Sequence, residues 1–129
     1  MIAAITQKPI TDIENYIAEL NDDNDLKNHI ISSILQSDEK HKADLKINFG
    51  RRLGWYVFVR VTKPKIVIET GVDKGLGSCV LTSALIKNAE EGFEGKYFGT
   101  DINPKAGYLL KGKYADYGKI LYGDSIESL

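Results

Sequence analysis

Few features of this sequence point to a disulfide-stabilised, membrane-bound or nucleic-acid-binding protein. The chain has a single cysteine, Cys79, which excludes an internal disulfide bond and favours a reducing compartment. Its 17 basic and 18 acidic residues give a net charge of −1, so no overall positive charge attracts nucleic acid or an anionic membrane. No apolar run approaches the roughly 20 residues that span a bilayer. We therefore expect a soluble, cytoplasmic domain with no nucleic acid and no membrane among its partners.

Metal-ligand patterns are scarce as well. His29 and His41 have no third ligand nearby in the sequence. The acidic run 21–25 lacks the central glycine and the final glutamate of an EF-hand calcium loop. We expect this run to cap a helix and form a solvated turn, because Asn and Asp side chains bond readily to nearby backbone groups. The sequence predicts no metal site, and it predicts that Cys79 is a small buried apolar residue.

Residues 1–62 have the pattern of a helical region. A second helix fits 26–35, and the segment 49–60 combines helical spacing with the β-branched and aromatic content of a strand. We favour a helix there, because Pro64 then breaks the chain before the next element. The face of the first helix is indicated by apolar residues at spacings of three and four: Ile10, Ile13, Ile17 and Leu20.

Residues 63–129 alternate between strand and helix patterns. Strands are predicted at 65–69, 96–101 and 118–122, and helices from about residue 77, over 104–115 and from residue 125. Strands joined by helical crossovers run parallel, with right-handed connections. We therefore expect an α/β fold in which an N-terminal helical cap region, 1–62, precedes the first β-α-β-α-β half of a Rossmann-like parallel sheet, 63–129.

The turn after the first predicted strand is rich in glycine. It reads E-T-G-V-D-K-G-L-G-S from Glu69, which spaces Gly71, Gly75 and Gly77 as G-x-x-x-G-x-G. A dinucleotide fingerprint is G-x-G-x-x-G, so the spacing counts against NAD or FAD. A Walker A loop is excluded too, because Lys74 precedes its glycine rather than following it.

This turn has groups that match S-adenosylmethionine. Glu69 brings a carboxylate for the ammonium group, and Gly71 allows close approach of the backbone. Free N–H groups near Gly77 and Ser78, at a helix N-terminus, suit the cofactor's carboxylate. The alternative is that the glycines only make a tight turn between strand and helix.

Two further acids follow the next predicted strands. Asp101 ends the second strand and can accept both ribose hydroxyls, as acids do in dinucleotide sites. Asp124 follows the third strand and can accept a hydrogen bond from the adenine amino group. Either acid alone is also a candidate helix cap. Because the carboxyl ends of parallel strands share one edge, we expect Glu69, Asp101 and Asp124 to gather there.

With these motifs in place, residues 51–129 resemble the class I (Rossmann-like) S-adenosylmethionine-dependent methyltransferases, most closely the small-molecule O-methyltransferase-like branch. The resemblance implies that Glu69 and Gly71 lie near the methionine portion, Asp101 on the ribose and Ile102 against the adenine. Asp73 stands where many such enzymes have a second glycine, and its side chain either crowds the cofactor or points to solvent. The full set of implied cofactor-binding residues is Glu69, Thr70, Gly71, Gly75, Gly77, Ser78, Asp101, Ile102, Asp124 and Ser125.

The acceptor side of such an enzyme has no counterpart in the sequence. A complete domain of the family resembles a seven-stranded sheet, and its later strands position the acceptor. Here the pattern stops after three strands, which would leave the first strand as an open edge that invites pairing. We expect either a truncated piece of a longer enzyme or a homo-oligomer that covers this edge, and no catalytic residue is predicted.

The favoured function is therefore an S-adenosylmethionine-dependent methyltransferase, or its cofactor-binding N-terminal portion, acting on a small hydroxylated acceptor. The alternative is a non-catalytic binding or assembly module that associates through its open sheet edge. A nucleotide-dependent oxidoreductase is a weaker third reading, which the glycine spacing opposes. Arg51, Arg52, Trp55 and Tyr56 precede the first strand and form either a lid over the cofactor or a packed amphipathic helix with solvated arginines.

Overall fold

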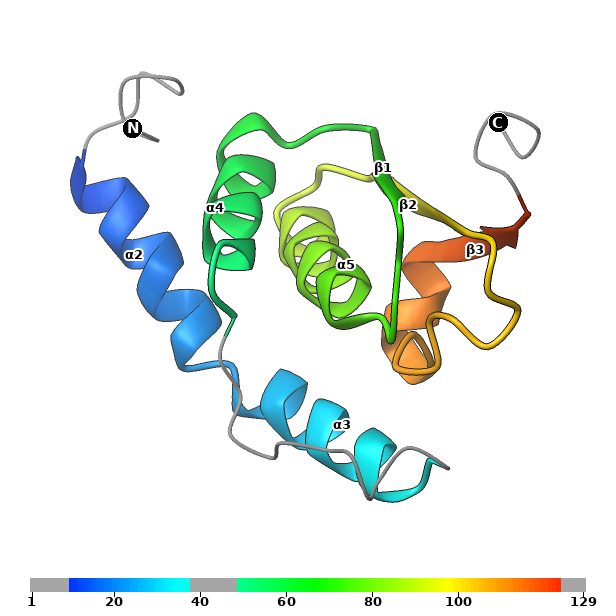
Figure 1. Cartoon of the computed structure of the whole chain (residues 1–129). Coiled ribbons are helices and arrows are strands. Elements are labelled where there is room, and N and C mark those ends of the chain that lie inside the picture. Colours follow the sequence, from blue (N-terminus) through cyan, green and yellow to red (C-terminus); the bar gives the residue numbers. More distant parts are fainter. Residues whose placement is uncertain (1–9, 38–48, 124–129) are drawn as a thin grey trace.

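The structure is a computed structural model that describes residues 10–37 and 49–123. It confirms an α/β fold in which helices precede a three-stranded sheet (Figure 1). No helix among these residues is long and apolar enough to cross a membrane. In chain order the elements are α2 (Ile10–Asn21), α3 (Asn24–Leu35), α4 (Arg52–Thr62), β1 (Ile66–Thr70), α5 (Leu76–Glu90), β2 (Lys96–Asp101), the 3-10 helix η2 (Gly112–Tyr117) and β3 (Gly118–Tyr122).

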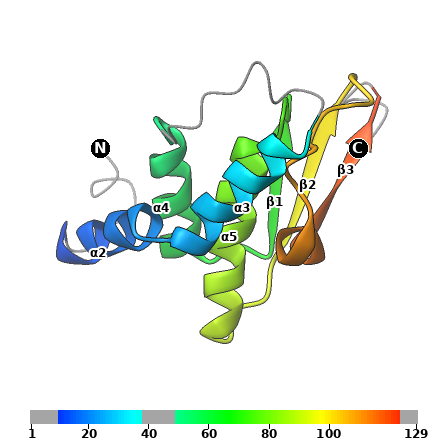
Figure 2. The same cartoon turned by 90° about the horizontal axis from the view of Figure 1, so that it is seen from below.

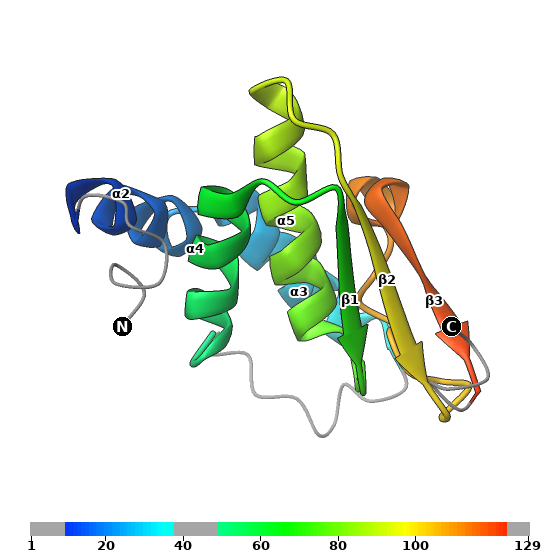
Figure 3. The same cartoon turned by 90° about the horizontal axis from the view of Figure 1, so that it is seen from above.

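The three strands form a parallel sheet in the order β1-β2-β3, as the alternating pattern predicts. The register pairs Glu69 with Gly99 across β1 and β2, and Asp101 with Tyr122 across β2 and β3. All three strands therefore end at the same edge of the sheet. The helices α4 and α5 begin at this same end of the molecule (Figure 3).

The ambiguous segment 49–60 forms the helix α4, which packs against α5. Helix α2 packs on α4, and α3 contacts α5, so that the helices build a layer on one side of the sheet (Figure 2). Because the apolar faces of these helices meet there, the hydrophobic core lies between the helices and one face of the sheet. Its fully buried members include Leu20, Leu26, Tyr56, Val80 and Leu85.

The helix predicted over 104–115 is wrong in type and position. Residues 104–109 form turns, and the 3-10 helix η2 follows at Gly112–Tyr117. Gly107 and Gly112 have φ values of 79° and 63°, a left-handed backbone that interrupts an α-helix. The Gly107 N–H also donates to the Asp73 carbonyl at 2.6 Å, which ties this segment to the glycine turn. The crossover is therefore shaped by contact with the turn rather than by helical periodicity.

The second face of the sheet carries no helix within the described part of the chain. Ile66 and Ile68, whose side chains lie on that face of β1, are 61% and 54% exposed. Strand β1 pairs only with β2, so its other edge has a row of unpaired backbone groups among the described residues. This confirms the expectation that the first strand lies at an edge. Parallel sheets are normally covered on both faces, so this surface is unusual.

Candidate functional site

The first strand ends in a buried carboxylate that is only half paired. Glu69 is 9% exposed, and its Oε1 atom accepts hydrogen bonds from the Tyr97 hydroxyl at 2.6 Å and the Ser78 hydroxyl at 3.2 Å. The Tyr97 and Ser78 hydroxyl oxygens also lie 2.7 Å apart, so either hydroxyl can donate to the other in place of its bond to Glu69. No described residue donates a hydrogen bond to Oε2 of Glu69. One oxygen therefore fixes the side chain, and the other is free to accept a donor.

Burial shifts the ionisation of both partners. It raises the pKa of Glu69, against the opposing effects of the hydrogen bonds from Tyr97 and Ser78 and of the positive charge of Arg52. Burial, together with the negative charge of Glu69, also raises the pKa of Tyr97, so the phenol remains a hydrogen-bond donor. A carboxylate in these surroundings gains more from a nearby cation than a solvated one does.

The glycine turn has the left-handed backbone that its composition predicts. Gly71 and Gly75 have φ values of 75° and 106°, and Asp73 has a φ of 59° although it is not a glycine. A positive φ is easy for glycine and strained for other residues, which explains why many enzymes of the resembled family have a glycine at the position of Asp73. The Asp73 side chain is exposed and its N–H donates to Asp101 Oδ2 at 3.0 Å, which joins the turn to the end of β2.

Gly77 lets the carboxylate of Glu69 lie against the first turn of α5. A Cβ atom at Gly77 would lie 2.4 Å from Glu69 Oε2 and 3.0 Å from Cζ3 of Trp55. The close approach that the glycine permits is thus made by the protein's own carboxylate and indole. Cys79 N–H bonds back to the Gly75 carbonyl at 3.0 Å, so the regular helical bonding of α5 starts one turn after Gly75.

Asp101 holds its carboxylate at the same edge of the sheet. Its Oδ1 accepts the N–H of Asn103 at 2.8 Å and its Oδ2 accepts the N–H of Asp73. The backbone bonds from Asn103 and Asp73 lower the pKa of Asp101, so it is ionised at neutral pH. Each oxygen keeps a lone pair for a further donor. Ile102 follows directly and is 77% exposed, so its apolar surface is open to a ligand.

The structure brings together most of the residues that the sequence singles out at this edge, namely Glu69, Gly71, Gly75, Gly77, Ser78 and Asp101. The Ser78 hydroxyl is fully buried and supports Glu69. Thr70 is exposed, and as the neighbour of Glu69 in β1 its side chain lies on the opposite face of the sheet. Asp124 and Ser125 lie outside the described residues.

One partner of Glu69, Tyr97, is not apparent from the sequence motifs, whereas Trp55 is among the residues singled out before the first strand. Tyr97 is fully buried and holds the carboxylate, and Trp55 reaches Gly77 from α4. The sequence contains one indication of this role of Tyr97, which is Gly99 inside the predicted second strand. A glycine inside a strand indicates that another group approaches the backbone closely. A Cβ atom at Gly99 would lie 2.4 Å from the Tyr97 hydroxyl oxygen.

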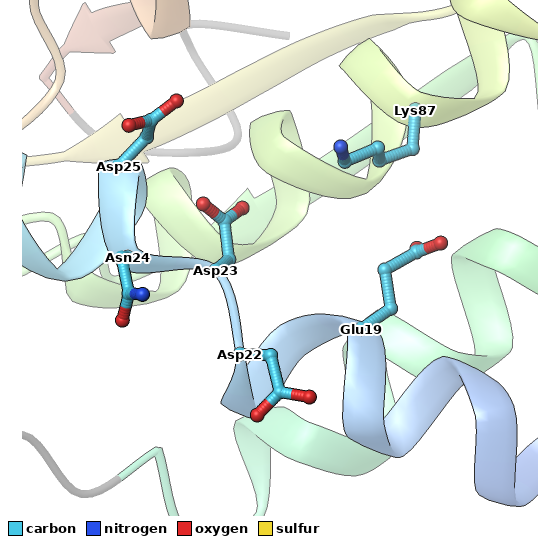
Figure 4. Close-up of a pocket in the computed structure, with 6 residues that line it drawn as sticks. All are labelled: Glu19, Asp22, Asp23, Asn24, Asp25 and Lys87. Carbon is cyan, nitrogen blue, oxygen red and sulfur yellow. The ribbon is translucent and has the colours of Figure 1, made fainter.

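A separate pocket of about 330 Å³ lies toward the other end of α5, where acidic residues face Lys87 (Figure 4). Asp23 accepts the Leu26 N–H at 3.0 Å as the cap of α3, which confirms the predicted role of the acidic run. Asp23 also accepts the Ser83 hydroxyl at 3.1 Å. In the ranges 10–37 and 49–123, no three His, Cys, Asp or Glu side chains form a group that could hold a metal ion. The lining residues are Glu19, Asp22, Asp23, Asn24, Asp25 and Lys87.

We compared the chain with protein-family models, with curated protein sequences and with solved structures, and none of the three comparisons gives a match.

Proposed function

We propose that this chain is an S-adenosylmethionine-dependent methyltransferase, or the cofactor-binding portion of one, and that its acceptor is a small hydroxylated molecule. The observation that carries the proposal is the half-paired carboxylate of Glu69, held at the carboxyl edge beside a glycine turn and joined to the Asp101 region through Asp73. In open parallel sheets, ligands bind beyond this edge.

Each group at the edge has a matching part of the cofactor. Oε2 of Glu69 would accept the ammonium group, and the carboxylate of Asp101 would accept the ribose hydroxyls. Ile102 offers an exposed apolar side chain for the adenine, and the resemblance of the motif adds Asp124 and Ser125 at the adenine edge. Bound S-adenosylmethionine would supply the methyl group. The protein's contribution is then mainly to position and desolvate the reacting groups.

Calorimetric titration with S-adenosylhomocysteine tests the proposal, with NADH as the competing ligand. We expect saturable binding of S-adenosylhomocysteine and none of NADH. Asp101→Ala should weaken binding about tenfold or more, because it removes a charged acceptor. Asp116→Ala is the matched control, since Asp116 is an exposed acid in η2. A folded chain that binds neither ligand, or that prefers NADH, would contradict the proposal.

The open edge of β1 favours a second candidate, a module that self-associates through its sheet. Unpaired backbone groups lie beside the exposed side chains of Ile66 and Ile68. Edges of this kind pair readily with another strand. We propose that a second copy covers this edge. Light scattering after size exclusion should then show a dimer that Ile68→Lys dissociates, while Phe93→Lys, at a side chain also 50% exposed but outside the sheet, leaves it intact. A monomer at every concentration contradicts this candidate.

A further inference from the structure

Arg52 is a cation close to the candidate site. It begins α4, the end of that helix nearest the strand ends (Figure 3). Its Nε atom is buried and makes no hydrogen bond within the described ranges 10–37 and 49–123. Among the described residues, the ion pairs involve Arg60 and lysines but not Arg52. A buried donor left unpaired is unfavourable, so a ligand that offers Arg52 a hydrogen-bond acceptor would bind favourably there.

Trp55 connects Arg52 to Glu69. The guanidinium carbon of Arg52 lies 5.9 Å from the centroid of the Trp55 ring. The same ring reaches the first turn of α5, where a Cβ atom at Gly77 would meet both Trp55 Cζ3 and Glu69 Oε2. The three side chains therefore border one small region. The segment thus forms the packed helix that the sequence analysis considered, and the role of its residues as a lid stays a prediction.

Arg52 and Glu69 interact without forming an ion pair. The positive charge of Arg52 opposes the rise that burial causes in the pKa of Glu69, in agreement with the contacts that both side chains make near Trp55. Yet no nitrogen of Arg52 lies within hydrogen-bonding distance of Glu69, and Oε2 of Glu69 accepts no bond from the described residues. A cation and an anion are thus held near each other, each with a free atom.

We propose that Arg52 binds the carboxylate of an α-amino-acid group whose ammonium is bound by Oε2 of Glu69. An α-amino acid has both charges on one carbon, so a single ligand group satisfies the two side chains together. Trp55 lies beside the guanidinium, within reach of a cation–π contact. This inference rests on the proposed function, in which the amino-acid group is the methionine end of the cofactor.

The test compares two ligands that differ only in the carboxylate, S-adenosylmethionine and decarboxylated S-adenosylmethionine. Calorimetry on the 129-residue chain should show that the wild type prefers S-adenosylmethionine by about tenfold to a hundredfold, the usual range for a hydrogen bond between charged groups. Arg52→Gln should remove this preference and leave binding of the decarboxylated ligand unchanged. Arg51→Gln is the matched control, because it removes the same charge from the adjacent, exposed position.

The outcomes separate this inference from the cofactor proposal. If the wild type binds S-adenosylmethionine and Arg52→Gln keeps the preference, or weakens both ligands equally, the role of Arg52 is wrong and the cofactor site stands. If the folded wild type binds neither ligand, both proposals are wrong. Arg52→Lys guards against misfolding of the glutamine variant, since it keeps the charge and should retain part of the preference. Thermal unfolding of each variant confirms that it is folded.

Discussion

Two clusters of buried charge lie toward opposite ends of α5, and they differ in how completely their polar atoms are paired. At the C-terminal end, the guanidinium of Arg60 bonds to Glu19 at 2.6 Å, to Asn88 at 2.6 Å and to Glu91 at 2.9 Å. Tyr56 donates a further bond to Glu19. At the N-terminal end, one oxygen of Glu69 and one buried nitrogen of Arg52 have no hydrogen-bond partner among the described residues.

The ionisation of the two clusters differs in the same way. Burial alone would raise the pKa of Glu19, but the bonds from Arg60 and Tyr56 lower it. Hydrogen bonds from Arg60 and Lys63 hold the pKa of Glu91 at about 2. Glu69, by contrast, has a raised pKa because burial is not fully compensated. The Arg60 cluster thus has the features of a structural connection between α2, α4 and α5, and the Glu69 cluster those of a site completed by a ligand.

The largest expected effect is on stability, from Arg60→Met. The substitution removes a buried guanidinium and leaves the partly buried carboxylate of Glu19 and the buried amide oxygen of Asn88 without this donor. Loss of one partner from a buried charge pair typically costs about 3–5 kcal/mol. Urea denaturation should therefore show a free energy of unfolding lower by about 3 kcal/mol or more.

The same change at an exposed arginine provides the control for Arg60. Arg51→Met should alter the free energy of unfolding by less than about 0.5 kcal/mol, because Arg51 is exposed. If Arg60→Met and Arg51→Met lowered the free energy of unfolding equally, the Arg60 cluster would not have the structural role assigned to it.

Gly77→Ala should have a smaller effect than Arg60→Met, and this effect should appear in the free energy of ligand binding rather than of unfolding. The added methyl group would lie 2.4 Å from Glu69 Oε2, so the carboxylate must move from its position. We expect affinity for S-adenosylhomocysteine to fall about tenfold, the size of one lost hydrogen bond to a charged group. Helix propensity favours alanine by about 1 kcal/mol, which offsets the cost of moving the carboxylate. The free energy of unfolding should therefore change little.

Gly92→Ala is the comparison for Gly77→Ala. Gly92 has a φ of 93° and nothing near its Cβ position, so this variant should lose some stability and no affinity. If Gly77→Ala binds the ligand as the wild type does, then Glu69 is not part of the site.

The smallest expected effect is a difference in pH dependence. A raised pKa in the folded state means that the folded protein binds more protons than the unfolded chain between the two pKa values. The contribution of Glu69 to stability is therefore lost as the pH rises from about 4.5 through its folded pKa. Glu91 has the opposite sign, because its lowered pKa gives stability that is lost as the pH falls from 4.5 towards 2.

Two conservative variants separate these contributions. Urea denaturation across this pH range should show that Glu69→Gln abolishes the loss of stability that the wild type shows as the pH rises above about 4.5. Glu91→Gln should reduce the loss on the acidic side, by a modest amount because the Glu91 side chain is 45% exposed. Identical pH profiles of wild type and Glu69→Gln would show that Glu69 is not perturbed.

The sequence predicts the order of the elements well, because local patterns decide them. The β-branched run before Glu69 forms β1, and the strand pattern correctly places Glu69 and Asp101 at the same edge of the sheet. The segment after Asp101 is mispredicted, because the left-handed Gly107 and its bond to Asp73 depend on a contact with the glycine turn. Local periodicity has no information on such a contact.

The pairing of buried charges could not be predicted for a related reason. Arg60 and Arg52 both lie in α4, and nothing in the sequence around either one names the acid that would pair with it. Arg60 is 2% exposed because Glu19 and Glu91 reach it from α2 and from the end of α5. Arg52 lacks such partners among the described residues. Only the tertiary arrangement distinguishes the structural arginine from the one at the site.

The fluorescence of Trp55 during titration with S-adenosylhomocysteine tests the central claim most directly. Trp55 is the single tryptophan of the chain and lies against the first turn of α5, so it reports on the region of Glu69 alone. We predict a saturable change in its emission, with a midpoint that matches calorimetry and is shifted to higher concentration in Glu69→Gln. Binding detected by calorimetry without any change at Trp55 would place the ligand elsewhere and contradict the account.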